Sequence, residues 1–408
     1  MSSAFNPPLP PAHPVPALGE ILCPRPRAAS RALLEGEPGL SLSYNARGAL
    51  FEIGQTLQAG AGTRTDVLLP AFHCPSGVTP LLEAGLRPVF YRVRPDLSVD
   101  WDDLLAKAGP GTRAVLVIHF FGFTSDLTPL QAMRAQGIAV IEDWSHAFLR
   151  LDEAGCPALP SMQGDFQVFS FWKLAACGVG GGLRRRAGPA AEPAWTRPQP
   201  PWRERVVRFK RELEEVLEHS PHRRSHRAFQ ALEAWRTGTR RGAAEAAMAP
   251  PPAQPPLRGE DRYPFDPLLA RAGMPGGVRR RLLGTDLTQL VQQRRTNYAW
   301  LAQGLAATDL LHPLRPQLDT ATCPWVFPLR VAQRDRFDRG WRAQGVALHT
   351  FGIWLHSALQ QADTATRADA EQLAAELLCL SVHQGLTRAD MERAVEVVGR
   401  HAAPGHPS

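Results

Sequence analysis

The chain has 408 residues, 44% of them hydrophobic and 21% charged, and a formal net charge of +7. This length exceeds one ordinary core, and the composition is that of a soluble globular protein, so we expect two packed units. The longest apolar stretch, 114–123, is about half of the ~20 residues that a membrane-spanning helix needs. Prolines interrupt the N-terminal segment where a signal peptide requires apolar residues. We therefore predict no membrane insertion and a cytoplasmic location.

The six cysteines lie far apart, with no Cys-x-x-Cys pair, which argues against a disulfide framework or a zinc site. Basic residues cluster at 184–186, 202–241 and 279–281. Such clusters can bind nucleic acid, but they equally suit a phosphorylated cofactor and an anionic substrate. Because no nucleic-acid-binding motif accompanies them, we expect no nucleic-acid partner and no metal.

Residues 1–40 are interpreted as an extended, Pro-rich lead-in. From about residue 42 to 183, short apolar segments alternate with helical patterns. The predicted helices cover 49–59, 77–84, 101–108 and 127–135, and the predicted strands cover 66–69, 88–92, 114–120, 139–142 and 166–171. Short, largely apolar strands are typical of a sheet covered on both faces. The pattern predicts an α/β protein with three α/β/α layers and a mostly parallel sheet.

An insertion at about 184–270 interrupts this pattern. Its Pro- and Ala-rich stretches at 188–201 and 246–257 predict linkers. Between them, helical spacing predicts one amphipathic helix with the apolar residues Val206, Phe209, Leu213, Val216 and Leu217, and a second helix at 229–235. The first could dock on a membrane or a partner. We favour the alternative, in which its apolar stripe packs on the main domain.

A smaller C-terminal α+β unit is predicted for residues 286–408. A long helix starts near Asp286, followed by a strand at 325–331 and a helix at 335–344. Thr387 and Asp390 predict the start of a final helix, because each can satisfy a free amide of its first turn. Residues 41–285, with the insertion, would then form a large cofactor-binding domain.

Two residues at the ends of predicted strands indicate where chemistry occurs, because ligands of open α/β sheets bind there. Asp143 follows the strand in IEDWSH, and a carboxylate there can keep a pyridinium nitrogen protonated; alone it could also cap a helix or bind Mg²⁺. Lys173 ends the aromatic strand of FQVFSFWK, where burial would lower its pKa and make it a nucleophile. The alternative is an ordinary surface lysine.

A third feature is the turn NARGAL at 45–50, which opens a helix. The free amides and the dipole at a helix start favour a phosphate, and Arg47 would add a bidentate donor. Ser170 could offer its hydroxyl to the same phosphate. Every helix has such a start, so the turn alone is weak evidence.

The order of these motifs resembles that of the DegT/DnrJ/StrS sugar aminotransferases, which share the aspartate aminotransferase fold (fold type I) and use pyridoxal 5'-phosphate (PLP). NARGAL is similar to the family's phosphate turn, IEDWSHAF to its Glu-Asp-x-[AS]-[HQ] motif and GDFQVFSFWK to its Phe-Ser-Phe…Lys strand. VLLPAFHCPSGVTPLLEAGLRPVFYRV, VIHFFGF and the C-terminal LAAELLCLSVHQGLTRADMERAVEVV resemble further family segments in the right order.

The resemblance implies a role for each site residue. Lys173 would form the Schiff base, Asp143 would face the pyridinium nitrogen and His146 would lie beside the phenolic oxygen. Ser170, Ala46 and Arg47 would hold the phosphate. The position that usually carries a ring-stacking aromatic is Cys74, which leaves Phe72 or His73 as substitutes.

The implied function is transfer of an amino group from an amino acid, expected to be glutamate, to a keto-sugar that is expected to be nucleotide-linked. The implied assembly is a homodimer. Four departures keep other functions open: only Trp172 separates Phe-Ser-Phe from Lys173, Cys74 replaces the stacking aromatic, Arg47 replaces a threonine, and no clear Gly-x-Asn-x-Arg loop is present. The alternatives are another PLP reaction on this fold and a non-catalytic relative in a polysaccharide assembly system.

Overall fold

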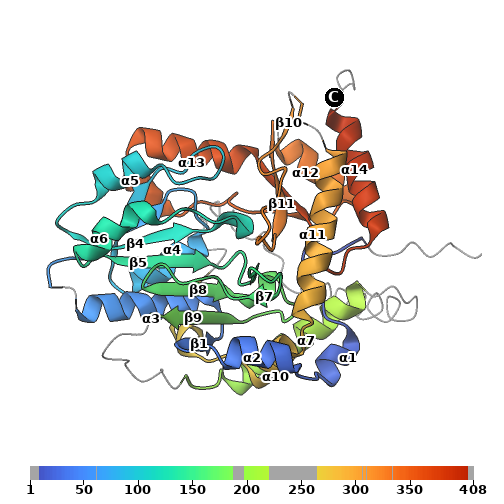
Figure 1. The fold of residues 1–408 in the computed structure, drawn as a ribbon, viewed down its shortest axis with the longest axis horizontal. Helices are drawn as coiled ribbons and strands as arrows, with labels where there is room; N and C mark the ends of the chain where they lie inside the picture. Colours follow the sequence, from blue (N-terminus) through green and yellow to red (C-terminus); the bar gives the residue numbers. More distant parts are fainter. Residues whose placement is uncertain are drawn as a thin grey trace, which may run out of the picture.

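The computed structural model describes residues 9–60, 62–186, 197–219, 264–305, 307–308, 310–332 and 334–402. Its central sheet has the strand order β1-β9-β8-β5-β4-β2-β3. Figure 1 labels β1, β9, β8, β5 and β4 in this order across the sheet. The strands are β1 (Leu40–Ser43), β2 (Asp66–Pro70), β3 (Arg87–Tyr91), β4 (Thr112–Ile118), β5 (Ala139–Trp144), β8 (Phe166–Ser170) and β9 (Gly181–Arg185). Strands β3, β2, β4, β5 and β8 are parallel, whereas β9 and β1 are antiparallel to their neighbours.

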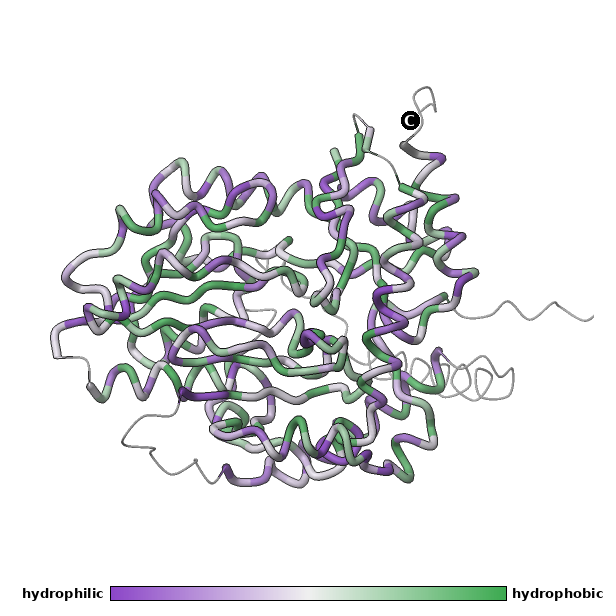
Figure 2. Tube along the Cα trace, viewed as in Figure 1, coloured by the Kyte–Doolittle hydropathy of each residue, from purple (hydrophilic) through white to green (hydrophobic). Residues whose placement is uncertain are grey.

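Helices cover both faces of this sheet. Alternate residues of β2 face opposite sides: Val67 and Leu69 join one core, and Leu68 joins the other. The first core includes residues of α3 (Ala46–Ala59) and α4 (Pro75–Glu83), and the second includes α5 (Trp101–Lys107) and α6 (Gln131–Ala135). Figure 2 shows apolar residues following the central strands. The predicted three-layer α/β/α class is confirmed.

The C-terminal residues build a second, antiparallel sheet with the order β10-β11-β13-β12. Its elements are α11 (Leu287–Gly304), β10 (Leu311–Pro313), β11 (Val326–Val331), α12 (Arg334–Ala343), β12 (Leu348–His349), α13 (Thr364–Glu376), β13 (Leu377–Ser381) and α14 (Arg388–Ala402). The predicted cap of the last helix is confirmed, because the backbone N–H and the hydroxyl of Thr387 both donate to Asp390 at 2.7 Å. The exact division of the chain into domains stays a prediction.

The described chain also contains several smaller elements. A two-stranded ribbon pairs β6 (Arg150–Leu151) with β7 (Pro157–Ala158). The 3₁₀ turns are η1 (Phe120–Gly122), η2 (Thr128–Leu130), η3 (Phe171–Lys173) and η5 (Ser357–Gln361). No helix within the described ranges is both long and apolar enough to cross a membrane.

The lead-in is not extended throughout. Residues 18–35 contain α1 (Leu18–Leu22) and α2 (Ala28–Glu35), so the prediction of an extended segment is wrong there. Both helices pack on α10 (Gly276–Gly284), and Leu34 of α2 is buried in the main core. Burial against a segment far along the chain overrides the local Pro-rich composition, which is a tertiary effect that sequence pattern cannot show.

The described part of the insertion contains α7 (Trp202–Glu218) and α9 (Pro267–Arg271). The predicted linker at 246–257, most of that at 188–201 and the predicted helix at 229–235 lie outside the described residues. In α7, Val206 is 56% exposed and Phe209 is 45% exposed, whereas Glu212 is buried. The prediction that the apolar stripe packs on the main domain is therefore wrong for these two residues, because the helix docks through charged side chains.

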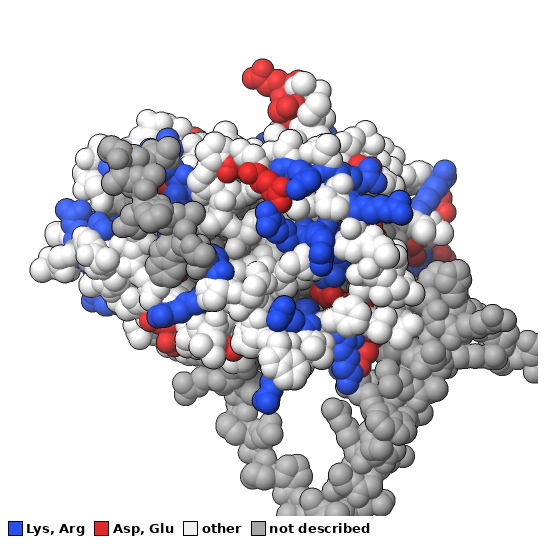
Figure 3. Space-filling view, turned by 90° about the horizontal axis from the view of Figure 1, so that it is seen from below, with Lys and Arg blue, Asp and Glu red and all other residues white. Residues whose placement is uncertain are grey.

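Several arginines of the basic clusters have acidic partners inside the protein. Arg185 pairs with Glu52 at 2.6 Å, and Arg279 pairs with Glu35 at 2.7 Å. Figure 3, which views the molecule from below, shows basic side chains spread over this face with acidic ones beside some of them. Some of the arginines behind the positive net charge therefore form ion pairs within the protein and are not free to bind a partner.

Candidate functional site

A cavity of about 280 Å³ lies where β2, β4, β5 and β8 reach their carboxyl ends. Most of the predicted site residues line it: Ala46, Arg47, His73, Asp143, His146, Ser170 and Lys173. Much of the remaining wall is formed by Tyr44, Asn45, Cys74, Ser145, Trp172, Arg208 and Phe351. Phe72 is the exception, since it is fully buried and packs on Phe120 and Phe351 with ring centroids 6.0 and 5.5 Å away.

Lys173 ends a short turn, Phe171–Lys173, called here the lysine turn, which follows β8 directly. Its Nζ lies 4.3 Å from the centre of the Trp325 ring and 6.0 Å from that of Phe351. Burial lowers the pKa of Lys173 to about 8, against the opposing charge of Asp143. Roughly a tenth of this amine is therefore neutral at pH 7, far more than for an ordinary lysine, and the neutral form is the one that acts as a nucleophile or proton acceptor.

Arg294 of α11 anchors the lysine turn, and the sequence analysis missed it. Its guanidinium donates to the carbonyls of Lys173 and Leu174 at 3.2 and 3.1 Å, and to that of Trp325 at 3.1 Å. Arg294 is fully buried. A signal was available: it occupies the apolar stripe of α11, three residues after the buried Val291 and four before Tyr298.

Asp143 is held in its ionised form. Burial alone would raise its pKa, but His73, whose Nε2 is 3.8 Å from Oδ2, and the N–H of Ser145, which donates to Oδ1 at 2.7 Å, together hold the pKa below its usual value. Gly77 leaves room for the imidazole, since a Cβ there would lie 2.3 Å from Nε2 of His73. His73 Nδ1 is buried without a hydrogen-bond partner in the described part of the chain.

His146 is a neutral hydrogen-bond donor. Burial, assisted by the charge of Lys173, lowers its pKa well below the usual value. Its Nδ1 accepts a hydrogen bond from the N–H of Phe121 at 3.1 Å, so the neutral ring carries its proton on Nε2. The ring stacks on Phe121, whose φ of 58° is a strained backbone conformation for a bulky residue.

The helix start at NARGAL borders the same cavity. Asn45 caps α3 by accepting from the N–H of Gly48 at 3.0 Å, while the N–H groups of Ala46 and Arg47 have no intrahelical partners. Arg47 lines the cavity and donates to the carbonyl of Pro264 at 3.1 Å. Ser170 is 4% exposed, and its hydroxyl has no hydrogen-bond partner among the described residues. Helix amides, a guanidinium and a free hydroxyl together suit a phosphate.

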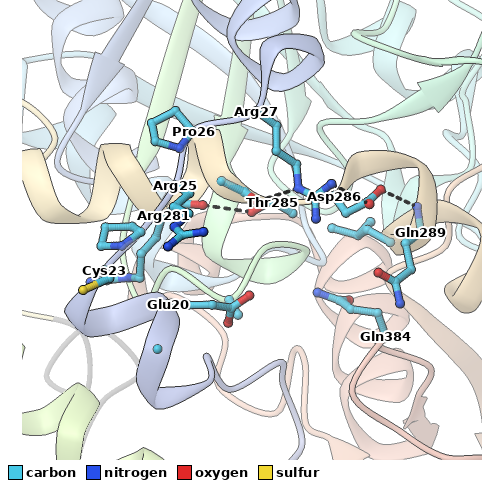
Figure 4. A pocket seen from close by; sticks show the side chains of 15 residues that line it. Glu20, Cys23, Arg25, Pro26, Arg27, Arg281, Thr285, Asp286, Gln289 and Gln384 are labelled. Atoms are coloured by element: carbon cyan, nitrogen blue, oxygen red, sulfur yellow. Dashed lines mark hydrogen bonds and ion pairs between the residues drawn. The ribbon is translucent and has the colours of Figure 1, made fainter.

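A larger cavity of about 570 Å³ lies near α1 and the start of α11. Figure 4 shows Arg27 and Asp286 pointing toward each other there, and they form an ion pair at 3.0 Å. Gln384, also in its wall, donates to the carbonyl of Leu174 at 2.9 Å. The described wall contains neither lysine nor histidine, so the groups suited to PLP chemistry gather in the smaller cavity.

The fold, with a lysine-bearing cavity at the carboxyl ends of the parallel strands, is the fold-type-I architecture of solved sugar aminotransferases. Residues 45–190 match the DegT/DnrJ/EryC1/StrS aminotransferase family, so the family resemblance is confirmed over the segment that supplies most of the cavity.

Among curated proteins, a 138-residue stretch is 32% identical to dTDP-4-dehydro-2,3,6-trideoxy-D-glucose 4-aminotransferase of Saccharopolyspora spinosa. This match spans only about a third of each protein, 33% of this chain and 34% of the relative.

The likeness to solved structures of other proteins extends over nearly the whole chain. Sugar aminotransferase CalS13 of Micromonospora echinospora superposes with a TM-score of 0.61 at 20% identity, over 96% of this chain and 99% of that one. Spr1654 of Streptococcus pneumoniae, solved in its PLP-form, gives a TM-score of 0.60 at 17% identity, over 95% and 92%. At these identities the likeness concerns the fold.

Proposed function

We propose that this protein is a PLP-dependent aminotransferase that moves an amino group from an amino acid, expected to be glutamate, to a nucleotide-linked keto-sugar. The observation that carries the proposal is the gathering of Lys173, Asp143 and the α3 helix start around one cavity. The family match and the sugar aminotransferases among the relatives and structural neighbours support the substrate class. A cytoplasmic homodimer remains the expected form.

The residues fit PLP by their own chemistry. When bound, PLP supplies an electron sink for the carbon that loses or gains a proton. The ionised Asp143 would accept a hydrogen bond from a protonated ring nitrogen, and Nε2–H of His146 would donate to the ring oxygen. Ser170, Arg47 and the amides of α3 would hold the phosphate. Nζ of Lys173, with its pKa of about 8, would form the covalent link and then move the proton.

The shortened spacing before Lys173 does not remove it from the cavity. The lysine turn directs the amine to Trp325 and Phe351, close enough to Asp143 for that charge to affect its pKa. A non-catalytic relative has no need of a buried, partly neutral lysine, which costs folding free energy. This favours an enzyme over the non-catalytic alternative.

Reduction with borohydride tests the proposal. We expect added PLP to give a visible absorption band, and borohydride to fix it on the peptide that contains Lys173. Lys173→Ala should lose both signals, whereas Lys107→Ala, at a half-buried lysine on α5, should keep them. Glutamate should then convert the cofactor to its amino form. If no amino acid does so while PLP stays bound, the transfer function is wrong and another PLP reaction is favoured.

A further inference from the structure

Helix α7 of the insertion docks beside the cavity through its charged face. The hydroxyl of Tyr44 donates to Glu204, and Glu212 forms a buried ion pair with Arg281 at 2.7 Å. The approach is close: Gly178, at φ +70°, has no room for a side chain, since a Cβ would lie 2.7 Å from Glu212. These contacts fix the register of α7 against the glycine-rich loop that follows Lys173.

Arg208 lies one turn from each anchor, and its side chain reaches the wall of the cavity. Its Nε is buried and has no hydrogen-bond partner among the described residues, and none of these forms an ion pair with it. Burial raises the pKa of Tyr44, while the charge of Arg208 and a side-chain hydrogen bond from it act to lower that pKa, so the guanidinium lies against the Tyr44 hydroxyl and only part of it is engaged. Glu204 and Glu212, the acidic residues nearest along the helix, are already engaged by Tyr44 and Arg281.

The charges around the cavity are unbalanced. Among the described residues of its wall, three are cationic, Arg47, Arg208 and Lys173, and one is a carboxylate, Asp143, which His73 already contacts. Burial lowers the pKa of Arg47, and the charge of Arg208 acts in the same direction, so the two guanidiniums repel each other. Buried charges of one sign are stable only with a counter-ion, and guanidiniums favour phosphate oxygens because of their planar, forked donors.

We propose that Arg208 binds the phosphate of the cofactor, together with Arg47, Ser170 and the first amides of α3. The insertion would thus supply a phosphate ligand from the same chain. This inference rests on the proposed function, since it assigns the anion as the phosphate of PLP.

A comparison of PLP with pyridoxal, which lacks the phosphate, tests the inference by equilibrium binding. In Arg208→Gln we expect the affinity for PLP to fall roughly tenfold or more, the loss typical of one charge-assisted hydrogen bond. The affinity for pyridoxal should stay unchanged, and Arg208→Lys should recover part of the affinity for PLP. The matched control is Arg205→Gln, an exposed arginine on the same helix, which should bind both ligands like the parent.

Three results would overturn the inference. Equal weakening of PLP and pyridoxal would mean that Arg208 only shapes the cavity. Unchanged affinity for PLP with a raised KM for the amino donor would assign Arg208 to the substrate carboxylate. Unchanged behaviour throughout would make the residue dispensable while the proposed function stands. If the parent binds no PLP, the proposed function fails first; stabilisation by inorganic phosphate in a thermal shift, lost in Arg208→Gln, then tests the anion site itself.

Discussion

Helices α7 and α11 each bring an arginine to the region of the lysine turn, but they bury it in different ways. Helix α11 carries Arg294 on its apolar stripe. The guanidinium of Arg294 donates hydrogen bonds to backbone carbonyls, including those of Lys173 and Leu174. Helix α7 exposes Val206 and Phe209 and leaves Nε of Arg208 without a described partner. A fully partnered guanidinium fixes structure, whereas one facing a cavity is available to a ligand.

The largest effect expected from this comparison is on folding stability. Arg294→Met would leave buried carbonyls without donors, so we expect the free energy of unfolding to fall by on the order of 3 kcal/mol. Arg208→Met loses the attraction of Arg208 to Tyr44 and Glu212 but also relieves its repulsion with Arg47, so it should change stability by less than about 1 kcal/mol. Urea titration of both cofactor-free variants measures the difference. Equal losses would contradict the distinction between the two arginines.

The next largest effect on folding stability is expected at Lys173, because burial of its charged amine lowers the free energy of unfolding. Its pKa falls from 10.5 to about 8, so between these values the unfolded chain holds a proton that the folded protein has released. The free energy of unfolding of the cofactor-free protein should therefore rise with pH across this window, and below pH 8 the penalty is fully present. Lys173→Met should stabilise that form by about 1–3 kcal/mol at pH 7.

Denaturant titrations at pH 7 and pH 10 measure both effects of Lys173. The variant should lose the part of the pH dependence that the parent shows between them. A parent and a variant with parallel pH profiles would show that the amine is solvated, which would remove the argument for a reactive lysine.

The site residues at the carboxyl ends of the strands could be predicted from the sequence. The residues from distant segments that cover these strand ends could not. Asp143 lies near the carboxyl end of β5 and Lys173 lies three residues after β8, so strand pairing brings them to one edge of the sheet. Trp325 covers Lys173 from a segment about 150 residues further along the chain, and no local pattern encodes such a contact. The position of Phe72 could not be predicted for a related reason. In the turn after β2, Phe72 is buried in the core and the next residue, His73, lines the cavity.

Gly77 should give a smaller and more local effect. A methyl group there would lie 2.3 Å from Nε2 of His73, so Gly77→Ala must displace the imidazole from Asp143. We expect PLP to bind a few-fold more weakly, by about 1 kcal/mol, with little change in overall folding. The matched control is Gly276→Ala, where a Cβ meets nothing within 4 Å. Wild-type affinity in Gly77→Ala would show that the ring position of His73 does not matter to the cofactor.

The smallest effect is expected on the outer face of α7. Val206 and Phe209 are about half exposed, so Val206→Ser and Phe209→Ser should each change the free energy of unfolding by no more than about 0.5 kcal/mol. On the docked side of the helix, Glu212→Ala would leave Arg281 buried without its ionic partner and should be far more destabilising. Denaturant titration of the three variants compares the faces directly. If the serine variants unfold as readily as Glu212→Ala, the apolar stripe holds α7 in place, and the position of Arg208 then depends on hydrophobic packing rather than on the ion pair.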